Sequence, residues 1–223
     1  RPWVITPHET SNPNAVAQIK KLAEALESSV VEVSSKDHDR AVALVSHVPQ
    51  VISSLLAARL VAAAESDVSL AGQGLRDTTR IAASDAELWT QILAANSTQV
   101  NRVLKDFSGD LAKVISALDN LSDPLNQQVV DAAIRQGNTG VEKIPGKHGS
   151  KHSTYAQVVV MIDDKPGELA RLLTEVGEIG INLEELKLEH SPSAQIGLVE
   201  LYVLPSAEQS LIADLQSRGW RIA

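Results

Sequence analysis

The chain has 223 residues, 43% hydrophobic and 22% charged, which is typical of a soluble globular protein with one large or two ordinary domains. The formal net charge of −8 argues against a nucleic-acid partner, because binding a phosphate backbone needs clustered Lys and Arg. The absence of cysteine excludes disulfides, thiolate metal ligands and cysteine nucleophiles, and an aromatic content of 3% predicts an aliphatic core.

Residues 1–36 predict a short strand–helix–strand unit. The runs WVIT (residues 3–6) and VVEV (residues 30–33) are rich in β formers. Between them, Asn12 and Pro13 predict a helix cap and a first helical residue. Two strands cannot bury a sheet by themselves, so we interpret this unit as the end of a larger α/β domain and expect the chain to be a fragment.

Residues 37–137 predict an all-helical region. A first helix is expected from near residue 39 to residue 64, kinked at Pro49 because proline has no backbone N–H. Apolar repeats at helical spacing resume near Asp85 and continue to Gly137, where we expect the last helix to end. These helices carry more apolar surface than one small domain can cover, so we expect an intertwined homodimer.

The segment 41–58 needs a separate test, because it contains no Asp, Glu, Lys or Arg and approaches the length of a membrane-spanning helix. Its serines, histidine, proline and glutamine would be costly in hydrocarbon. A helix that is apolar on most faces is also typical of the centre of a helical core. We therefore expect a core helix and no membrane partner.

Residues 138–153 predict a linker, since glycine, proline and charged residues are concentrated there. Two histidines in this segment, His148 and His152, could suggest a metal site. In a linker rich in glycine and serine such side chains are usually solvated, so we expect no metal site.

Residues 154–223 change from helical to alternating periodicity. Apolar runs separated by glycines predict four strands and two helices, over residues 157–162, 168–179, 181–189, 198–204, 207–218 and 220–223. The order strand–helix–strand–strand–helix–strand is the ferredoxin-like βαββαβ arrangement, with both helices on one face of the sheet.

Three motifs carry a resemblance to known families. DDKPGELARLLTEVGEIGINLEEL (residues 163–186) resembles the start of an ACT domain, a small regulatory module that binds amino acids at a dimer interface. HDRAVALVSHVPQ (residues 38–50) and GLRDTTRIAASDAELW (residues 74–89) resemble the C-terminal helical domain of prephenate dehydrogenases, the oxidoreductases of tyrosine biosynthesis. Together, the resemblance covers essentially the whole chain.

The resemblance implies a multidomain α and α+β fold. It implies the end of a Rossmann-type nucleotide-binding domain in residues 1–36 and a helical dimerisation and substrate domain in residues 37–137. That helical domain is similar to the C-terminal domain of 6-phosphogluconate dehydrogenase. The linker 138–153 and an ACT regulatory domain in residues 154–223 follow.

The resemblance also implies an activity, namely the NAD- or NADP-dependent oxidative decarboxylation of prephenate to 4-hydroxyphenylpyruvate by a cytoplasmic homodimer under feedback by tyrosine. In the family, the catalytic histidine and the glycine-rich cofactor loop lie upstream of these motifs, and no such loop occurs in this sequence. We therefore expect no catalytic residue here, a cofactor bound mainly upstream, and binding and dimerisation without turnover. Two alternatives stay open: an arogenate dehydrogenase and a non-catalytic amino-acid-sensing dimer.

Arg80 is the residue that the resemblance places against a carboxylate of the substrate dianion. A planar guanidinium pairs bidentately with a carboxylate and stays charged at any working pH. Asp77 can hold the guanidinium and Trp89 can cover it by stacking, so we expect both to orient or gate the site. From spacing alone, a solvated connector between helices is the competing interpretation.

Ser46, His47 and Gln50 are the other candidates for substrate binding. His47 and Gln50 share a helix face by their spacing, and a kink at Pro49 would free a backbone carbonyl beside them. The family commonly has a second histidine at the position of Gln50, where it contacts the side chain of the substrate. Glutamine cannot become a cation, and this departure leaves open the choice between prephenate, a keto acid, and arogenate, an amino acid.

Pro166, Gly167 and Asn182 are the candidates for ligand binding in the ACT-like region. Gly167 has no side chain to block a ligand from the backbone, and Pro166 stiffens the turn. The following helix presents free N–H groups to a ligand carboxylate, and Asn182 can hydrogen-bond the ligand from the other side. We expect tyrosine as the ligand because it is the pathway product, whereas the competing interpretation is a tight turn and a helix stop.

Overall fold

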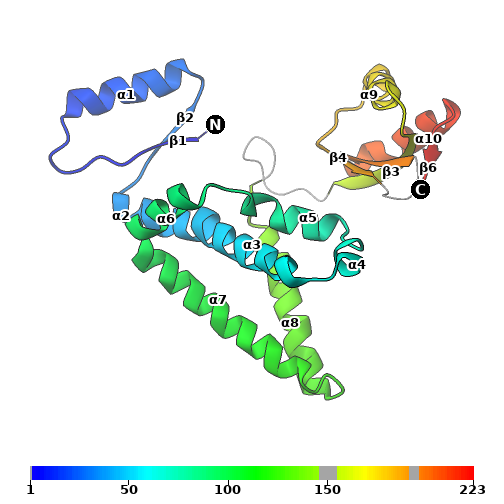
Figure 1. The fold of residues 1–223 in the computed structure, drawn as a ribbon. Coiled ribbons are helices and arrows are strands. Elements are labelled where there is room, and N and C mark those ends of the chain that lie inside the picture. Colours follow the sequence, from blue (N-terminus) through cyan, green and yellow to red (C-terminus); the bar gives the residue numbers. More distant parts are fainter. Residues whose placement is uncertain (1, 146–154, 191–195) are drawn as a thin grey trace. The chain divides into compact units, whose positions relative to one another are not determined.

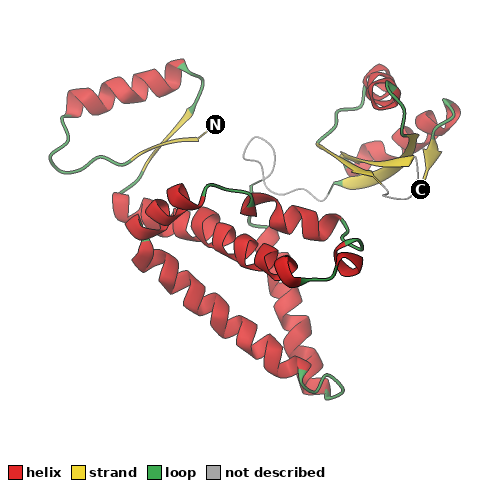
Figure 2. Cartoon of the chain, in the orientation of Figure 1, coloured by secondary structure: helices red, strands yellow, loops and turns green. Residues whose placement is uncertain are grey.

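The computed structural model describes residues 2–145, 155–190 and 196–223 of the chain (Figure 1), with side chains described in these ranges except at residues 189 and 190. The chain divides into two compact units, Arg1–Val130 and Asp131–Ala223. Figure 2 shows that helices make up most of the first unit and that the larger sheet lies in the second.

The N-terminal part is a strand–helix–strand unit, as the sequence predicts. Strand β1 (Pro2–Ile5) and strand β2 (Ser29–Glu32) pair in parallel, and helix α1 (Pro13–Ala25) connects them. The Asn12 side chain accepts a hydrogen bond from the backbone N–H of Asn14 at 2.9 Å, which caps the first turn of α1. The unit is therefore one parallel crossover, the building block of α/β sheets.

The central helical run contains a π-helical turn that the sequence analysis did not foresee. It comprises α2 (Ser35–Val42), the π turn η1 (Ala43–His47), α3 (Val48–Arg59) and the 3₁₀ turn η2 (Leu60–Ala62). Pro49 has no N–H to donate to a carbonyl in the preceding turn and its ring crowds that turn. The wider π turn directly before Pro49 relieves this conflict, where we expected a simple kink.

The run Ser35–Ala62 is the one helix in the described residues that is long and apolar enough, by length and composition, to cross a membrane. Core helices of soluble proteins pass the same test. Ala43 and Val48 of this run are buried against Val100 of α7, and Gln50 and Ser53 are buried polar residues within it. We interpret the run as the central packing helix of the helical region.

The remaining helices of this region are α4 (Glu65–Val68), α5 (Gln73–Thr79), the 3₁₀ turn η3 (Arg80–Ala82), α6 (Ala86–Ala95), α7 (Ser97–Leu118) and α8 (Pro124–Val141). Helix α3 contacts α5, η3 and α7, so it is the element around which the others pack. The structure extends the last helix past Gly137, where we expected its end, because an exposed helical glycine costs only about 1 kcal/mol relative to alanine.

A large apolar face of the helical region is uncovered. Residues of α7 that recur at helical spacing are between 47% and 55% exposed, namely Leu111, Ile115 and Leu118. Leu125 at the start of α8 is 68% exposed. A row of exposed apolar side chains on one helix face is typical of an interaction site.

The C-terminal unit is a four-stranded antiparallel sheet with two helices, in the predicted order. Its elements are β3 (Ala156–Asp163), α9 (Glu168–Ile179), β4 (Glu185–His190), β5 (Ile196–Val203), α10 (Glu208–Ser217) and β6 (Arg221–Ile222). The strand order is β4-β5-β3-β6, so β5 lies between the two strands that α9 connects, and β3 lies between the two that α10 connects. This is the split βαβ topology of the ferredoxin-like arrangement.

The core of this unit is apolar and closed. Leu172 and Val176 of α9 and Leu211 and Leu215 of α10 are at most 2% exposed, and they pack with buried residues of β3 and β5 such as Leu201. Alternation along β5 is complete, since every second side chain from Gly197 to Val203 is buried. One face of the sheet is therefore covered by both helices.

Candidate functional site

Five neighbouring elements of the helical region carry the six residues predicted there. Ser46 and His47 lie in η1, Gln50 in α3, Asp77 in α5, Arg80 in η3 and Trp89 in α6. Because α3 packs against α5 and η3, the structure brings the Arg80 segment beside the helix that carries Gln50. Ser46 is exposed, and its side chain makes no hydrogen bond to any residue that the structure describes.

His47 is half-buried in the π turn and is held from two sides. Its ring meets that of Trp89 edge to face, with centroids 6.1 Å apart and an interplanar angle of 83°. Its Nδ1 lies 3.3 Å from the amide nitrogen of Asn96, which also donates a 2.7 Å hydrogen bond to the backbone carbonyl of Asp39. Asn96 is 8% exposed, so the π turn, α6 and the start of α7 share a buried polar contact.

Gln50 is buried, at 6% exposure, and its amide orientation is fixed by hydrogen bonds. The Ser84 hydroxyl gives its one hydrogen to the carbonyl of Ile81 at 2.5 Å, so the Ser84 oxygen can only accept from the Gln50 amide nitrogen, at 3.1 Å. The same nitrogen donates to the Ser54 hydroxyl at 3.3 Å. Gln50 therefore ties α3 to the segment that follows Arg80.

The amide oxygen of Gln50 is left as an open acceptor. It has no hydrogen-bond partner among the described residues. Among those residues, Ser53 Oγ is the one side-chain polar atom that is both enclosed and without a partner. The Gln50 oxygen is therefore accessible from outside. A group that meets it must donate a hydrogen bond.

A cavity of about 310 Å³ lies between α3 and the segment that leads into α6. Its wall includes Gln50, Ser54, Ser84, Asp85 and Trp89, together with apolar residues of both elements. It contains the predicted residues Gln50 and Trp89, whereas Ser46, His47, Asp77 and Arg80 lie outside its wall. Asp85 also caps α6 by accepting from the backbone N–H of Leu88 at 2.7 Å.

Arg80 is exposed and has no ion pair or hydrogen bond with any described residue. Asp77 instead accepts a 2.8 Å hydrogen bond from Gln73, four residues earlier on α5, and the aromatic contact of Trp89 is with His47. The structure therefore shows no contact of Asp77 or Trp89 with Arg80. The expectation that these two residues hold and cover Arg80 stays a prediction. An exposed ion pair contributes little to stability, so the hydrogen bond from Gln73 stabilises Asp77 about as much as an ion pair with Arg80 would.

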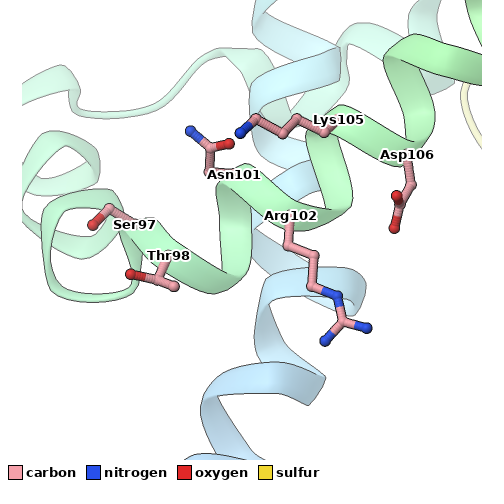
Figure 3. A pocket seen from close by; sticks show the side chains of 6 residues that line it. All are labelled: Ser97, Thr98, Asn101, Arg102, Lys105 and Asp106. Carbon is pink, nitrogen blue, oxygen red and sulfur yellow. The ribbon is translucent and has the colours of Figure 1, made fainter.

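Figure 3 shows a second hollow, of about 540 Å³, along the first half of α7. It is lined by Ser97, Thr98, Asn101, Arg102, Lys105 and Asp106, all from one helix and all exposed. The ends of the Asn101 and Lys105 side chains lie toward each other, and Arg102 points away from them (Figure 3). This is an open polar helix face and contains none of the predicted residues.

In the C-terminal unit, Pro166 and Gly167 are exposed and Gly167 directly precedes α9. Gly167 has φ +94°, a conformation that other residues rarely adopt, so the turn itself requires a glycine. Asn182 is exposed and donates to the Glu184 carboxylate at 2.8 Å. Both the turn-forming and the ligand-binding interpretations of these residues therefore remain.

The turn before Gly167 carries paired charges. The Asp163 carboxylate accepts hydrogen bonds from Lys165 at 2.9 Å and Arg221 at 3.3 Å. The hydrogen bond from Lys165 is the main cause that lowers the pKa of Asp163. Within the described residues, no group of three or more His, Asp or Glu could hold a metal ion, and His148 and His152 lie outside those residues.

Comparison with known proteins shows which family this region resembles. Residues 34–129, which include all six predicted residues of the helical region, match the family model of the prephenate dehydrogenase dimerisation domain. The probable prephenate dehydrogenase NovF of Streptomyces niveus is 31% identical over 227 residues, covering 99% of this chain and 63% of that protein. Residues 34–129 belong to the family of prephenate dehydrogenase dimerisation domains, and the similarity to NovF extends over nearly the whole chain.

Other relatives agree with the family. The prephenate dehydrogenase of Bacillus subtilis is 24% identical over 83% of this chain and 50% of its own length. The cyclohexadienyl dehydrogenase of Zymomonas mobilis is 30% identical over 52% of this chain and 41% of its own length. The chain thus spans between 41% and 63% of the length of these three curated relatives.

Solved structures share the fold. Synechocystis arogenate dehydrogenase is 26% identical with a TM-score of 0.50, covering 62% of this chain and 52% of that one. The prephenate dehydrogenase of Aquifex aeolicus, solved with hydroxyphenyl propionate and NAD⁺, is 20% identical with a TM-score of 0.52 over 62% of this chain and 49% of that one. The second similarity shows the fold alone.

Sequence reasoning missed two residues that contact the predicted site residues. Asn96 stands between two helices, where an asparagine ordinarily caps the second helix, and its partner His47 is 49 positions away. Ser84 looks like a residue of a polar connector, and its partner Gln50 is 34 positions away. No local pattern signals either contact.

Proposed function

We propose that this chain is the substrate-binding, dimerising and regulatory part of a prephenate dehydrogenase of tyrosine biosynthesis, located in the cytoplasm. The whole protein would convert prephenate to 4-hydroxyphenylpyruvate by NAD- or NADP-dependent oxidative decarboxylation. The observation that carries the proposal is the match of residues 34–129 to the family's dimerisation domain, with Arg80, His47 and Gln50 inside it.

The roles of the site residues follow from their contacts. Arg80 is exposed and unpaired within the described residues, so its guanidinium is free to bind a carboxylate of the substrate dianion. Gln50 and Trp89 line the 310 Å³ cavity and would contact the body of the substrate. His47 and Ser46 would hydrogen-bond its polar groups, while Asp77 would orient or gate the site from α5.

The residues of this chain do not fit a binding site for NAD or NADP. The β1–α1–β2 crossover is the one element of the type that carries such sites in the described residues, and the sequence contains no glycine-rich phosphate loop. We therefore propose that the cofactor is bound mainly by a part of the whole protein that precedes these residues, and that β1–α1–β2 is the end of that Rossmann-type domain. The catalytic histidine would belong to the same part.

The exposed apolar residues of α7 support a homodimer through residues 37–137. Leu111, Ile115 and Leu118 are 47%, 55% and 54% exposed in a single chain, and the matching family model is that of a dimerisation domain. A second copy would remove this surface from water, which is the main driving force of such an association.

We propose that residues 154–223 form an ACT domain that binds tyrosine. The split βαβ topology and the glycine turn before α9 support this, since the turn opens backbone N–H groups to a ligand carboxylate. Pro166, Gly167 and Asn182 would line that site. A separate module can bind the end product of the pathway, so the product regulates the enzyme without competing for the substrate site.

Arogenate is the second candidate substrate, and one observation favours it. The open Gln50 oxygen accepts but cannot donate a hydrogen bond, and the Asp85 carboxylate lies in the same cavity wall. The ammonium group of an amino acid would donate to both, whereas the keto group of prephenate could donate to neither.

The test is the formation of NADH or NADPH by the whole protein with prephenate and with arogenate. Turnover of prephenate supports the proposal, and turnover of arogenate alone supports the second candidate. If neither is turned over while tyrosine binds, the chain is an amino-acid-sensing dimer and the enzymatic proposal is wrong.

A further inference from the structure

We infer that Asn96 is a positioning residue that fixes which ring nitrogen of His47 carries the proton. Asn96 joins α6 to α7 and is 8% exposed. Its amide nitrogen lies 2.7 Å from the backbone carbonyl of Asp39. A carbonyl oxygen can only accept, so the NH₂ side of the amide must face Asp39, and the orientation of the Asn96 amide is settled.

The same NH₂ group determines which ring nitrogen of a neutral His47 carries the proton. The Asn96 nitrogen lies 3.3 Å from His47 Nδ1 and has a second hydrogen to donate. A ring nitrogen that carries a hydrogen cannot accept another, so Nδ1 must hold the lone pair. The proton of the neutral ring therefore sits on Nε2, and the ring has one defined tautomer.

Asn96 makes these two contacts and does not cap helix α7. An asparagine at the start of a helix ordinarily accepts from a backbone N–H, but the Asn96 side chain makes no such bond to α7. Asp and Ser, which cap helices about as well as Asn, could not replace it, because aspartate has no N–H and serine has a single hydrogen. The two contacts of Asn96 need the two hydrogens of an amide.

The other side of the His47 ring is open. Nε2 makes no hydrogen bond to a described residue, and Ser53 Oγ is the one buried polar side-chain atom without a partner among them. Nε2 is therefore accessible, and the edge contact with Trp89 restricts the ring's rotation. On the proposed function, His47 then offers an N–H donor to an anionic substrate, in addition to the guanidinium of Arg80.

The protonation state can be read directly, without an activity assay. In the 223-residue chain labelled with ¹⁵N-histidine, long-range ¹H–¹⁵N NMR at about pH 9 distinguishes the two neutral tautomers, since histidines are ordinarily neutral there. A His47→Gln variant assigns the signal. We expect an unprotonated Nδ1 and a protonated Nε2, and a protonated Nδ1 in the unchanged chain would overturn the inference.

Variants of Asn96 sharpen the test. Asn96→Asp replaces a donor by an acceptor, so the proton should move to Nδ1, and Asn96→Ala should let the tautomer ratio relax toward that of free histidine. Asn101→Asp, the same change at an exposed position of α7, should leave the signal unchanged. A His47 signal that is the same in the unchanged chain and in Asn96→Ala would show that Asn96 is structural only, even if Asn96→Asp fails to fold.

A kinetic measurement separates this inference from the proposed function. In the whole protein at about pH 9, where the ring is neutral, Asn96→Asp should raise the KM for the dianionic substrate about tenfold or more, with the KM for the cofactor nearly unchanged, because the proton leaves Nε2 and a charge-assisted donor is lost. An unchanged substrate KM would contradict the inference. Absence of turnover in the unchanged protein would contradict the proposed function and would leave the NMR result standing.

Discussion

The helical region and the C-terminal unit differ in how much of their apolar surface they bury within one chain. The C-terminal unit closes an apolar core around residues such as Leu172, Leu201 and Leu211, all 0% exposed. In the helical region the buried cluster is small, centred on Ala43, Val48 and Val100, while α7 and α8 expose large apolar side chains. The C-terminal unit thus closes its core within one chain, whereas the helical region leaves exposed apolar side chains that we propose a second copy covers.

Polar residues divide in the same way. Gln50, Ser53 and Asn96, the buried polar residues among those described, all belong to the helical region. Ion pairs of the C-terminal unit, such as Lys165–Asp163 and Arg221–Asp163, are at its surface. Buried amides orient other groups and are costly to leave unpaired, which supports our proposal that the helical region recognises the substrate.

The largest effect is expected in the closed core. Leu211→Ala should lower the unfolding free energy of the C-terminal unit by about 2–5 kcal/mol, because it leaves a cavity in a packed site. Leu204→Ala, the same change at 49% exposure, is the matched control and should cost much less. Denaturant unfolding measures both, and equal losses would show that this unit has no specific core.

Arg80 tests substrate recognition in the helical region. Arg80→Ala in the whole protein should weaken binding of the dianion by about 2–4 kcal/mol while cofactor affinity stays nearly unchanged. Arg76→Ala, an exposed arginine of the preceding helix, is the control and should leave the substrate KM unaltered. An unchanged KM in Arg80→Ala would remove Arg80 from the site.

Ser84 tests whether a buried amide holds the Arg80 segment in place. Ser84→Ala removes the acceptor of the 3.1 Å bond from Gln50, which should cost about 1–3 kcal/mol in stability and raise the substrate KM. Ser69 makes the same kind of hydroxyl bond to a carbonyl three residues earlier but has no buried partner, so Ser69→Ala is the control. Equal effects of the two changes on KM would contradict the role of Ser84.

The smallest effect is expected from the surface charges of the C-terminal unit. The pKa of Asp163 is lowered, chiefly by the hydrogen bond from Lys165, so its stabilising contribution is present above the unfolded-state pKa of about 4 and is lost as pH falls through the lower folded-state pKa. Asp163→Asn should therefore change the melting temperature slightly at pH 7 and still less at pH 3. A larger change at pH 3 would contradict this assignment.

The features that sequence predicted well are local ones. Asn12 and Pro13 at the start of α1 and the glycine that ends α9 act on their own neighbours, so their patterns are readable from the chain. The order of strands and helices in residues 154–223 also follows from local periodicity.

The features that sequence could not predict depend on distant partners. The pairs Gln50–Ser84 and His47–Asn96 join elements that are far apart in the chain, and the π turn before Pro49 is one of several ways to accommodate a proline. Local spacing also suggested a pair between Asp77 and Arg80, but the Asp77 carboxylate contacts Gln73, four residues before it. Spacing shows which residues can meet and not which of them do.

The most direct test of the contrast between the two units is the oligomeric state of the chain. Light scattering of the 223-residue chain at micromolar concentration should give the mass of a dimer. Ile115→Glu, which places a charge on the uncovered face of α7, should give a monomer, and Leu204→Glu, at an exposed apolar position of the C-terminal unit, should remain dimeric. A monomer for the unchanged chain, or a dimer that survives Ile115→Glu but not Leu204→Glu, would contradict the account.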